Sequence, residues 1–217
     1  VVYMNAESSL EISLQAVIDA IMLSGFGTDT LINVMDANGK INNMTLSGSV
    51  ISNKAMRPAV TIQNTTVQSN RARGFLLQTE NAVVENCTFK DTALAAILLA
   101  PDLEYWYEMS PSKNVVIRNN TFENCGEYAS GIIQIATNHD SPAMTYPSYV
   151  HQDIVIQNNT FSSGCRTALF GVCIDTLTFT DNDFSGFKGK YASLRYCTNV
   201  TLDEQTRENS SMPNVTE

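Results

Sequence analysis

Apolar and polar residues alternate in an octet that recurs five times along the chain, at residues 60–67, 82–89, 115–122, 154–161 and 177–184. Alternation with a period of two predicts β-strands that bury one face. The fifth residue of each copy is asparagine or aspartate, which tolerates a left-handed bend, so we expect the chain to turn there. Stacked on one another, these residues would form a ladder: Asn64, Asn86, Asn119, Asn158 and Asp181.

The spacing of the octets indicates a solenoid. Their last residues are 67, 89, 122, 161 and 184, so successive copies lie 22, 33, 39 and 23 positions apart. A period of about 22 residues is typical of one solenoid turn. A second apolar segment follows each octet, at residues 74–78, 95–99, 131–135, 168–172 and 192–196. We therefore predict an all-β protein, a right-handed parallel β-helix of the pectate-lyase-like type.

The repeat predicts one β-helix domain over residues 1–217, ending in a polar tail at 203–217. Residues 10–23 are interpreted as an earlier coil, residues 30–34 as a second strand, and residues 44–51 as a shortened octet. Because the chain begins with Val1 rather than methionine, we interpret it as a mature protein, an excised part or a fragment of a longer chain.

Five cysteines without a CxxC motif predict neither a zinc site nor a full disulfide framework. Cys173 and Cys197 are expected at the same place in adjacent coils, and Cys125 and Cys165 nearly so. Small apolar cysteine suits such stacks, so we expect buried thiols rather than disulfides.

Charge and hydropathy restrict the partners. The formal net charge of −9 would repel nucleic acid and anionic membranes, so neither is expected as a partner. No run of eighteen apolar residues occurs, so we expect no membrane span.

The two longest coils carry their extra residues at the same point, between the second strand and the next octet, at 100–114 and 136–153. The flanking coils are short there, so we expect the two connections to form a wall beside a lower floor, and thus a cleft. The connections carry acidic, aromatic and histidine side chains: Asp102, Glu104, Tyr105, Trp106, Tyr107, Glu108, His139 and Asp140.

Aromatic rings beside carboxylates suit a carbohydrate, whose CH faces stack on rings while its hydroxyls bind acids. The alternative is that the rings only pack the connection onto its coil. Carboxylates roughly 6.5–9.5 Å apart support inverting glycoside hydrolysis, and carboxylates about 5 Å apart support retaining hydrolysis. By position Glu80, Asp102 and Asp140 are candidates, although exposed acids are usually only solvated. His139, Asp140 and His151 have no diagnostic ligand spacing, so we expect no metal or cofactor.

Several segments resemble the bacterial α-1,3-galactosidases of glycoside hydrolase family 110, best over residues 60–135. The most specific are Asn70-Arg-Ala-Arg-Gly74 and the cluster of Asp102, Tyr105-Trp106 and Glu108. The resemblance implies an inverting exo-hydrolase that removes terminal α-1,3-linked galactose without a cofactor, with Arg73, Asp102, Trp106 and Glu108 lining the sugar site.

Residues 27–34 also resemble a family segment with paired aspartates before Ile-Asn-Val-His, but Thr28 replaces one acid and Met35 the histidine.

Our hypothesis is that Asp29 and Asp102 act as acid and base on terminal α-linked galactose. The alternative is a non-catalytic carbohydrate-binding or surface-structural β-helix. The carbohydrate interpretation implies a secreted or periplasmic bacterial protein. The predicted substrate-binding residues are Arg73, Glu80, Tyr105, Trp106, Glu108, His139 and Asp140.

Overall fold

The computed structural model describes residues 58–101, 112–136 and 149–216, together with the backbone of four short strands nearer the N-terminus. The chain divides into two compact units, Val1–Met56 and Arg57–Glu217. The described part contains no helix that is long and apolar enough to cross a membrane.

The first unit contains two antiparallel strand pairs. Strand β1 (Val2–Met4) pairs with β2 (Ser8–Leu10), and β3 (Leu31–Met35) pairs with β4 (Ile41–Thr45). We predicted that residues 30–34 and 44–51 belong to parallel coils, which is wrong for Leu31–Val34 and for Met44 and Thr45, whereas residues 46–51 lie outside the described residues. Residues 36–40 are too few for a parallel crossover, whereas they suffice for a hairpin. Apart from Leu10, which ends β2, the predicted coil at 10–23 lies outside the described residues, and the single-domain prediction stays a prediction for residues 1–57.

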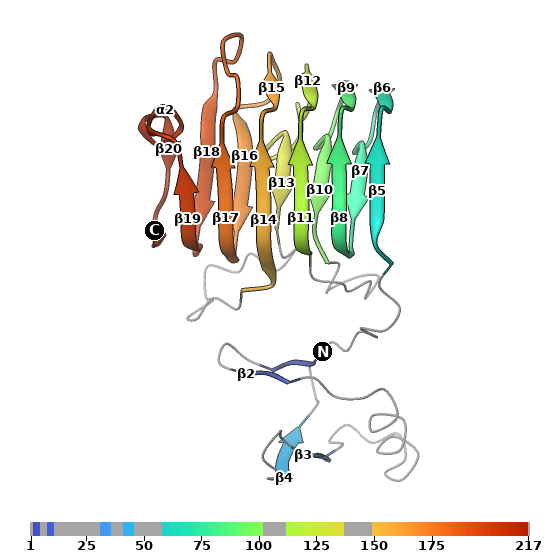
Figure 1. The fold of residues 1–217 in the computed structure, drawn as a ribbon, viewed down its shortest axis with the longest axis vertical. Coiled ribbons are helices and arrows are strands. Elements are labelled where there is room, and N and C mark those ends of the chain that lie inside the picture. The colour runs from blue at the N-terminus through green and yellow to red at the C-terminus, as the bar shows by residue number, and fades with distance from the viewer. Residues whose placement is uncertain are drawn as a thin grey trace. The chain divides into compact units, whose positions relative to one another are not determined.

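The second unit is a solenoid of parallel strands in three sheets (Figure 1). The first sheet contains β5 (Val60–Gln63), β8 (Glu80–Glu85), β11 (Lys113–Arg118), β14 (His151–Gln157), β17 (Ile174–Thr180) and β19 (Thr198–Leu202). The second contains β6 (Thr66–Asn70), β9 (Thr88–Thr92), β12 (Thr121–Glu123) and β15 (Thr160–Phe161). The third contains β7 (Phe75–Leu77), β10 (Ile97–Leu99), β13 (Ile133–Ile135), β16 (Thr167–Val172), β18 (Lys190–Arg195) and β20 (Ser210–Ser211).

The register of the first sheet confirms the octet repeat. The first residues of the octets pair in order from coil to coil: Val60 with Ala82, then Val115, Ile154 and Leu177. The fifth residue of every octet has a left-handed backbone, with φ between 53° at Asn64 and 57° at Asp181. Each octet therefore bends into two strands, and the predicted second segments form the third sheet. The predicted parallel β-helix is confirmed.

The last residues of the octets form the centre of the core. Phe89, Phe122, Phe161 and Phe184 are buried and stack in sequence, with ring centroids 5.0, 4.9 and 5.3 Å apart. Stacking is possible because each coil places the same octet position at the same point of its cross-section. The aromatic stack therefore connects four coils through the interior.

A hydrogen-bonded asparagine ladder lies at the sixth octet position. Asn120 Oδ1 accepts from the Cys87 N–H at 2.9 Å, and Asn120 Nδ2 donates to the Val84 carbonyl at 3.0 Å. Asn159 Oδ1 accepts from Asn120, and Asn182 Oδ1 accepts from Asn159, each at 3.0 Å. The fifth-position residues that we predicted as a ladder do stack, but they are exposed at the bend. The buried amides are their neighbours.

All five cysteines are free thiols, and four of them are buried, so the preference for thiols over disulfides is confirmed. The expected alignment was wrong by one residue for one pair. Because Asp175 pairs with Thr198, Cys197 lies beside Ile174 rather than Cys173. Cys125 pairs with Gly164, so Cys165 follows it by one position, close to the expected place.

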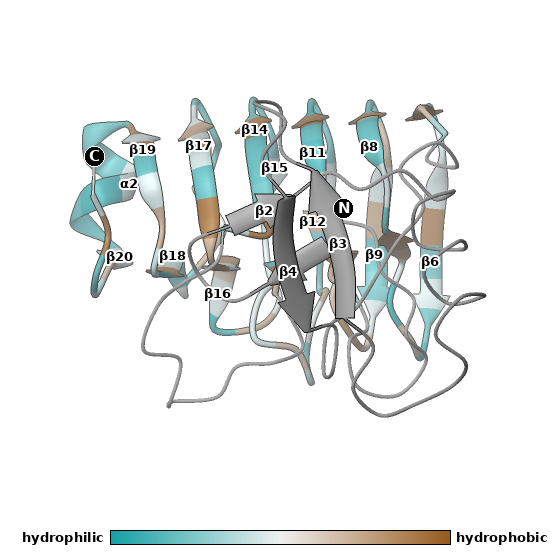
Figure 2. Cartoon of the chain, turned by 90° about the horizontal axis from the view of Figure 1, so that it is seen from below, coloured by the Kyte–Doolittle hydropathy of each residue, from teal (hydrophilic) through white to brown (hydrophobic). Residues whose placement is uncertain are grey.

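The polar C-terminal segment caps the last coil. Helix α2 (Glu204–Glu208) begins after Asp203, whose Oδ1 accepts from the Thr206 N–H at 2.8 Å. Its Oδ2 accepts from the Asp181 N–H of the previous coil at 2.9 Å. Figure 2 shows α2 as hydrophilic, as expected for a segment that turns its polar side chains to water.

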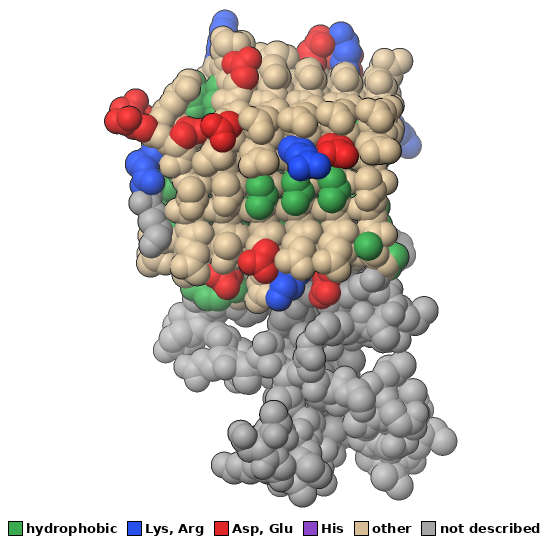
Figure 3. All heavy atoms as spheres, viewed as in Figure 1, with side chains coloured by type: hydrophobic (Ala, Val, Ile, Leu, Met, Phe, Trp, Pro, Cys, Tyr) green, Lys and Arg blue, Asp and Glu red, His purple; other side chains and the backbone are tan. Residues whose placement is uncertain are grey.

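The outward face of the first sheet is mostly polar. Val83, Val116 and Val155 form a short apolar row across three paired strands. Thr61 and Thr178 continue the same row at either end. Figure 3 shows this row as a small apolar band within a face of polar side chains.

Candidate functional site

The two long connections leave the solenoid at one corner, where the third sheet passes into the first. One joins Leu99 of β10 to Lys113 of β11, and the other joins Ile135 of β13 to His151 of β14. Lys113 pairs with Gln152, so the connections return to adjacent strands. The flanking coils are short there, since Cys173 alone joins β16 to β17. We call this place the loop-bearing corner. Its position confirms that both connections arise from the same edge.

The ends of the first connection are anchored to neighbouring coils. Gln78 Nε2 donates to the Ala100 carbonyl at 2.9 Å, and the Gln152 N–H donates to the Ser112 carbonyl at 3.0 Å. Ala100, Pro101 and Ser112 are buried. These contacts hold Ala100 and Ser112, at the described ends of the connection, against the solenoid.

His151 joins the two ends of the second connection. Its side chain is fully buried, and Nε2 lies 3.0 Å from the carbonyl oxygen of Ala136. A carbonyl only accepts, so Nε2 carries the proton and donates. Nδ1 has no partner. Burial lowers the pKa of His151 to about 4, and the bond to Ala136 opposes this only partly, so the ring is neutral at pH 7.

This arrangement argues against His151 as a metal ligand. Nε2 is occupied by the backbone of Ala136, and no group of three His, Cys, Asp or Glu side chains suited to a metal occurs in the described part. His139 and Asp140, the other two residues considered for a cation, lie outside the described residues. His151 is therefore an anchor of the second connection.

Two of the predicted site residues are described, and they lie at different corners. Glu80 is the first residue of β8, half-buried at the loop-bearing corner. Arg73 is exposed in the turn before β7, at the far end of that strand. Strand β7 separates them, so the structure does not bring them together. The remaining predicted residues lie outside the described residues and stay predictions: Asp29, Asp102, Tyr105, Trp106, Glu108, His139 and Asp140.

A polar row that the sequence reasoning missed forms the floor of the loop-bearing corner. Its members directly precede the octets or their equivalent, and each has a φ between 52° and 62°: Asn81, Asn114, Asp153, Thr176 and Asn199. Asn114 Nδ2 donates to Asn81 Oδ1 at 3.0 Å. The sequence contained a signal for this row, because three of the five octets directly follow asparagine or aspartate. Such a row presents amide and carboxylate groups beside both connections.

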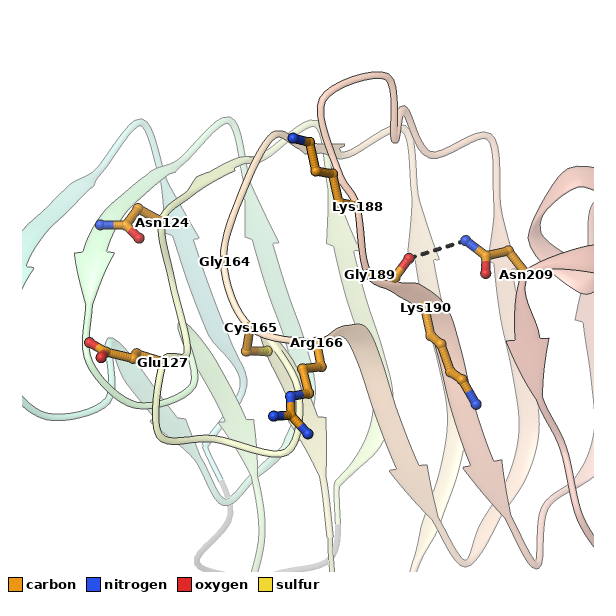
Figure 4. A pocket seen from close by; sticks show the side chains of 9 residues that line it. All are labelled: Asn124, Glu127, Gly164, Cys165, Arg166, Lys188, Gly189, Lys190 and Asn209. Carbon is orange, nitrogen blue, oxygen red and sulfur yellow. Dashed lines mark hydrogen bonds between the residues drawn. The ribbon is translucent and has the colours of Figure 1, made fainter.

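A second feature lies at the corner between the second and third sheets. A hollow of about 580 Å³ is lined by residues of the turns 124–127, 164–166 and 188–190 and by Asn209 (Figure 4). Three of its lining residues are cationic: Arg166, Lys188 and Lys190. The sequence reasoning did not identify this hollow, because its residues come from turns without a recurring pattern.

Comparison with known proteins supports both the fold and the resemblance. Residues 13–144 match the family described as "Right handed beta helix region". The chain is 32% identical over 178 residues to alpha-1,3-galactosidase B of Akkermansia muciniphila, covering 73% of this chain and 21% of that protein. It is 36% identical over 141 residues to alpha-1,3-galactosidase B of Parabacteroides distasonis, covering 63% and 23%.

Alpha-1,3-galactosidase A of Bacteroides fragilis is 31% identical over 157 residues, covering 71% of this chain and 26% of that protein. The matched part therefore spans about a fifth to a quarter of the length of these relatives. Given the parallel three-sheet solenoid and these similarities, the chain belongs to the right-handed β-helix family and is a β-helix like those of glycoside hydrolase family 110.

Proposed function

We propose that the chain is the β-helix of a glycoside hydrolase that removes terminal α-linked galactose from glycans. The observation that carries the proposal is the 31–36% identity to proteins named alpha-1,3-galactosidase. The fold supports it, because two long connections rise from one corner, which is how a solenoid builds a binding site on a rigid scaffold.

The proposed chemistry is inversion by two carboxyl groups. One acid protonates the leaving oxygen, and the other carboxylate activates a water molecule on the opposite face of the sugar. We assign these roles to Asp29 and Asp102. Such a mechanism uses side chains alone and needs no cofactor.

Sugar binding is assigned to the two connections and the described corner. Tyr105 and Trp106 would stack on the CH face of galactose, while Glu80, Glu108 and Asp140 accept from its hydroxyls. His139 completes the proposed set at this corner, whereas Arg73, at the other end of β7, lies away from Glu80 and is not part of it. Substrates of this kind are glycans outside the cell, so we propose a secreted or periplasmic location and, given the net charge of −9, no nucleic-acid partner.

The test is release of galactose. The full chain is incubated with a chromogenic α-galactoside and with a trisaccharide ending in α-1,3-linked galactose, beside Asp29→Asn and Asp102→Asn. We expect release by the unaltered protein and at least a hundredfold loss in both variants. NMR of the first product should show β-galactose, the inverted anomer. Glu208→Gln, an exposed acid on α2, is the matched control and should retain full activity.

The competing function is carbohydrate binding without catalysis. Thr28 and Met35 favour it, because they stand where the resembling family segment has an acid and a histidine. Sugar binding without any release of galactose would establish this function and contradict the hydrolase.

A further inference from the structure

A row of outward side chains crosses the third sheet beside the loop-bearing corner. In β10 and β13 only the middle residue is half-buried, Leu98 and Gln134, while both of its neighbours are buried. These two residues stand two positions before Ala100 and Ala136, where the long connections begin. The strand pairing extends the row over five coils: Leu76, Leu98, Gln134, Phe170 and Ser193. We call it the third-sheet row, and it runs along the solenoid at the foot of both connections.

The third-sheet row presents large apolar side chains to water. Leu76 is 38% exposed and is one of two large hydrophobic residues that are exposed in the described part. Leu98 and Phe170 are half-buried at the paired positions of other coils. The corresponding row of the first sheet carries only the smaller valine and threonine side chains. Apolar side chains gathered on an exposed face mark a surface where a ligand or partner binds.

Neighbouring groups fix the middle of the row. Gln134 Oε1 accepts from the Ser130 N–H at 3.2 Å, which orients the amide, and Gln134 Nε2 donates to no described residue. Gln134 pairs directly with Phe170. A Cβ on Gly131 would lie 2.7 Å from the Phe170 nitrogen, so the backbone passes close to this residue. The Arg195 guanidinium carbon lies 5.4 Å from the centre of the Phe170 ring. Since neighbouring strands lie about 4.8 Å apart, one small ligand can contact the amide and the ring together.

We propose that the third-sheet row binds the sugars that precede the terminal galactose of a glycan. Phe170 and Leu98 contact CH groups of a sugar, and Gln134 Nε2 donates to one of its oxygens. The hydroxyl of Ser193 extends the polar contacts to the next coil. A glycan on the row can reach the connections, because both features share β10 and β13. The choice of a saccharide rests on the proposed function, whereas its place rests on exposure and strand pairing.

The test compares a long and a short ligand on the full chain carrying Asp102→Asn, a change made to limit turnover. Calorimetry is run with methyl α-galactoside and with a trisaccharide that ends in α-1,3-linked galactose. We expect the trisaccharide to bind about tenfold more tightly, because only the longer ligand reaches the row. Phe170→Ala and Gln134→Glu should each lower the trisaccharide affinity about fivefold. Neither should change the affinity for methyl α-galactoside.

Two comparisons separate a binding role from a structural one. Gln134→Glu keeps the oxygen that accepts from Ser130 and the volume of the side chain, but it lacks the Nε2 donor. Val116→Ala truncates a half-buried outward residue of the first sheet and should leave both affinities unchanged. Thermal unfolding followed by circular dichroism shows that each variant is folded.

Equal affinity for the two ligands, or a trisaccharide affinity that neither row variant lowers, would overturn the proposal. A dimer in sedimentation that Phe170→Ala dissociates would also overturn it, because a second copy of the chain would then occupy the row. Galactose release from the chromogenic α-galactoside by the chain with Asp102 reports separately on the hydrolase. Its absence would contradict the proposed function, while tighter binding of the trisaccharide would still support the row.

Discussion

His151 shows how one residue can hold a connection on a solenoid. The ring is fully buried, donates to the Ala136 carbonyl and has no partner for Nδ1 in the part of the chain that the structure describes. Protonation would place a second N–H and a charge in a buried position where no described residue accepts them. Such a group stabilises the fold only while it stays neutral.

This gives a pH dependence with a definite sign. The pKa of His151 falls from 6.5 in the unfolded chain to about 4 in the fold. Between these values the unfolded state binds more protons, so stability falls as the pH falls. The free energy of unfolding should decrease by about 3 kcal/mol from pH 6.5 to pH 4 because of this residue. Urea denaturation at a series of pH values measures it.

His151→Gln supplies the comparison, because glutamine can still donate to Ala136 but does not titrate. Its curve should lack the decrease that the unaltered protein shows, whereas His139→Gln should keep it. Parallel curves for the unaltered protein and His151→Gln would show that other groups cause the acid sensitivity.

At the scale of elements, the asparagine ladder ties the bend of each octet to the next coil. Asn120 accepts from the Cys87 N–H and donates to the Val84 carbonyl, so one side chain serves two backbone groups of the preceding coil. Its own N–H donates to Asn159 Oδ1. A ladder of this kind satisfies buried backbone groups at a corner where the strands no longer pair.

Asn120→Ala should therefore be strongly destabilising. It leaves the buried Cys87 N–H and the Val84 carbonyl without their partners, and each unsatisfied group costs on the order of 1–3 kcal/mol. We expect the free energy of unfolding to fall by about 3 kcal/mol in total. Chemical denaturation followed by circular dichroism is the measurement.

The neighbouring residue is the matched control. Asn119 is exposed with φ 55°, and glycine adopts that conformation freely, so Asn119→Gly should change stability by less than about 1 kcal/mol. If the two variants lost equal stability, the bend rather than the ladder would be the important feature.

At the scale of the whole molecule, the described coils from residue 58 onward share one core. The stack of Phe89, Phe122, Phe161 and Phe184 passes from coil to coil. All four rings belong to the last residue of their octets. In a solenoid each coil contacts only its neighbours, so such shared columns couple the coils.

Removing the second ring of this stack should affect both neighbours. Phe122→Ala leaves a cavity between Phe89 and Phe161 and should cost about 4 kcal/mol. Phe122→Leu fills most of that space and should cost less than half as much. Thermal unfolding followed by tyrosine fluorescence and by circular dichroism would show whether the coils still unfold together. A small effect of Phe122→Ala would mean that the stack contributes little to the coupling.

Much of the fold was predictable because the repeat is local. Alternation, the left-handed bend at the fifth octet position and the spacing between copies all lie within short stretches, and the register agrees with them. The hairpin of β3 and β4 was misread because its residues resemble strands without showing which strand they pair with. The predicted alignment of Cys197 was wrong by one residue for a related reason. The left-handed bends of adjacent coils lie at Cys173 and at Tyr196, so the register follows the backbone and not the residue type.

The sequence by itself determined the parallel solenoid, its core positions and the shared corner of the two long connections, because all three follow from periodicity along the chain. Only the tertiary structure decided that His151 binds Ala136, that Arg73 and Glu80 lie at different corners, and that turns from three coils line one hollow. These features depend on which side chains face each other across neighbouring coils. Such contacts join residues tens of positions apart, and no pattern within a single repeat encodes them.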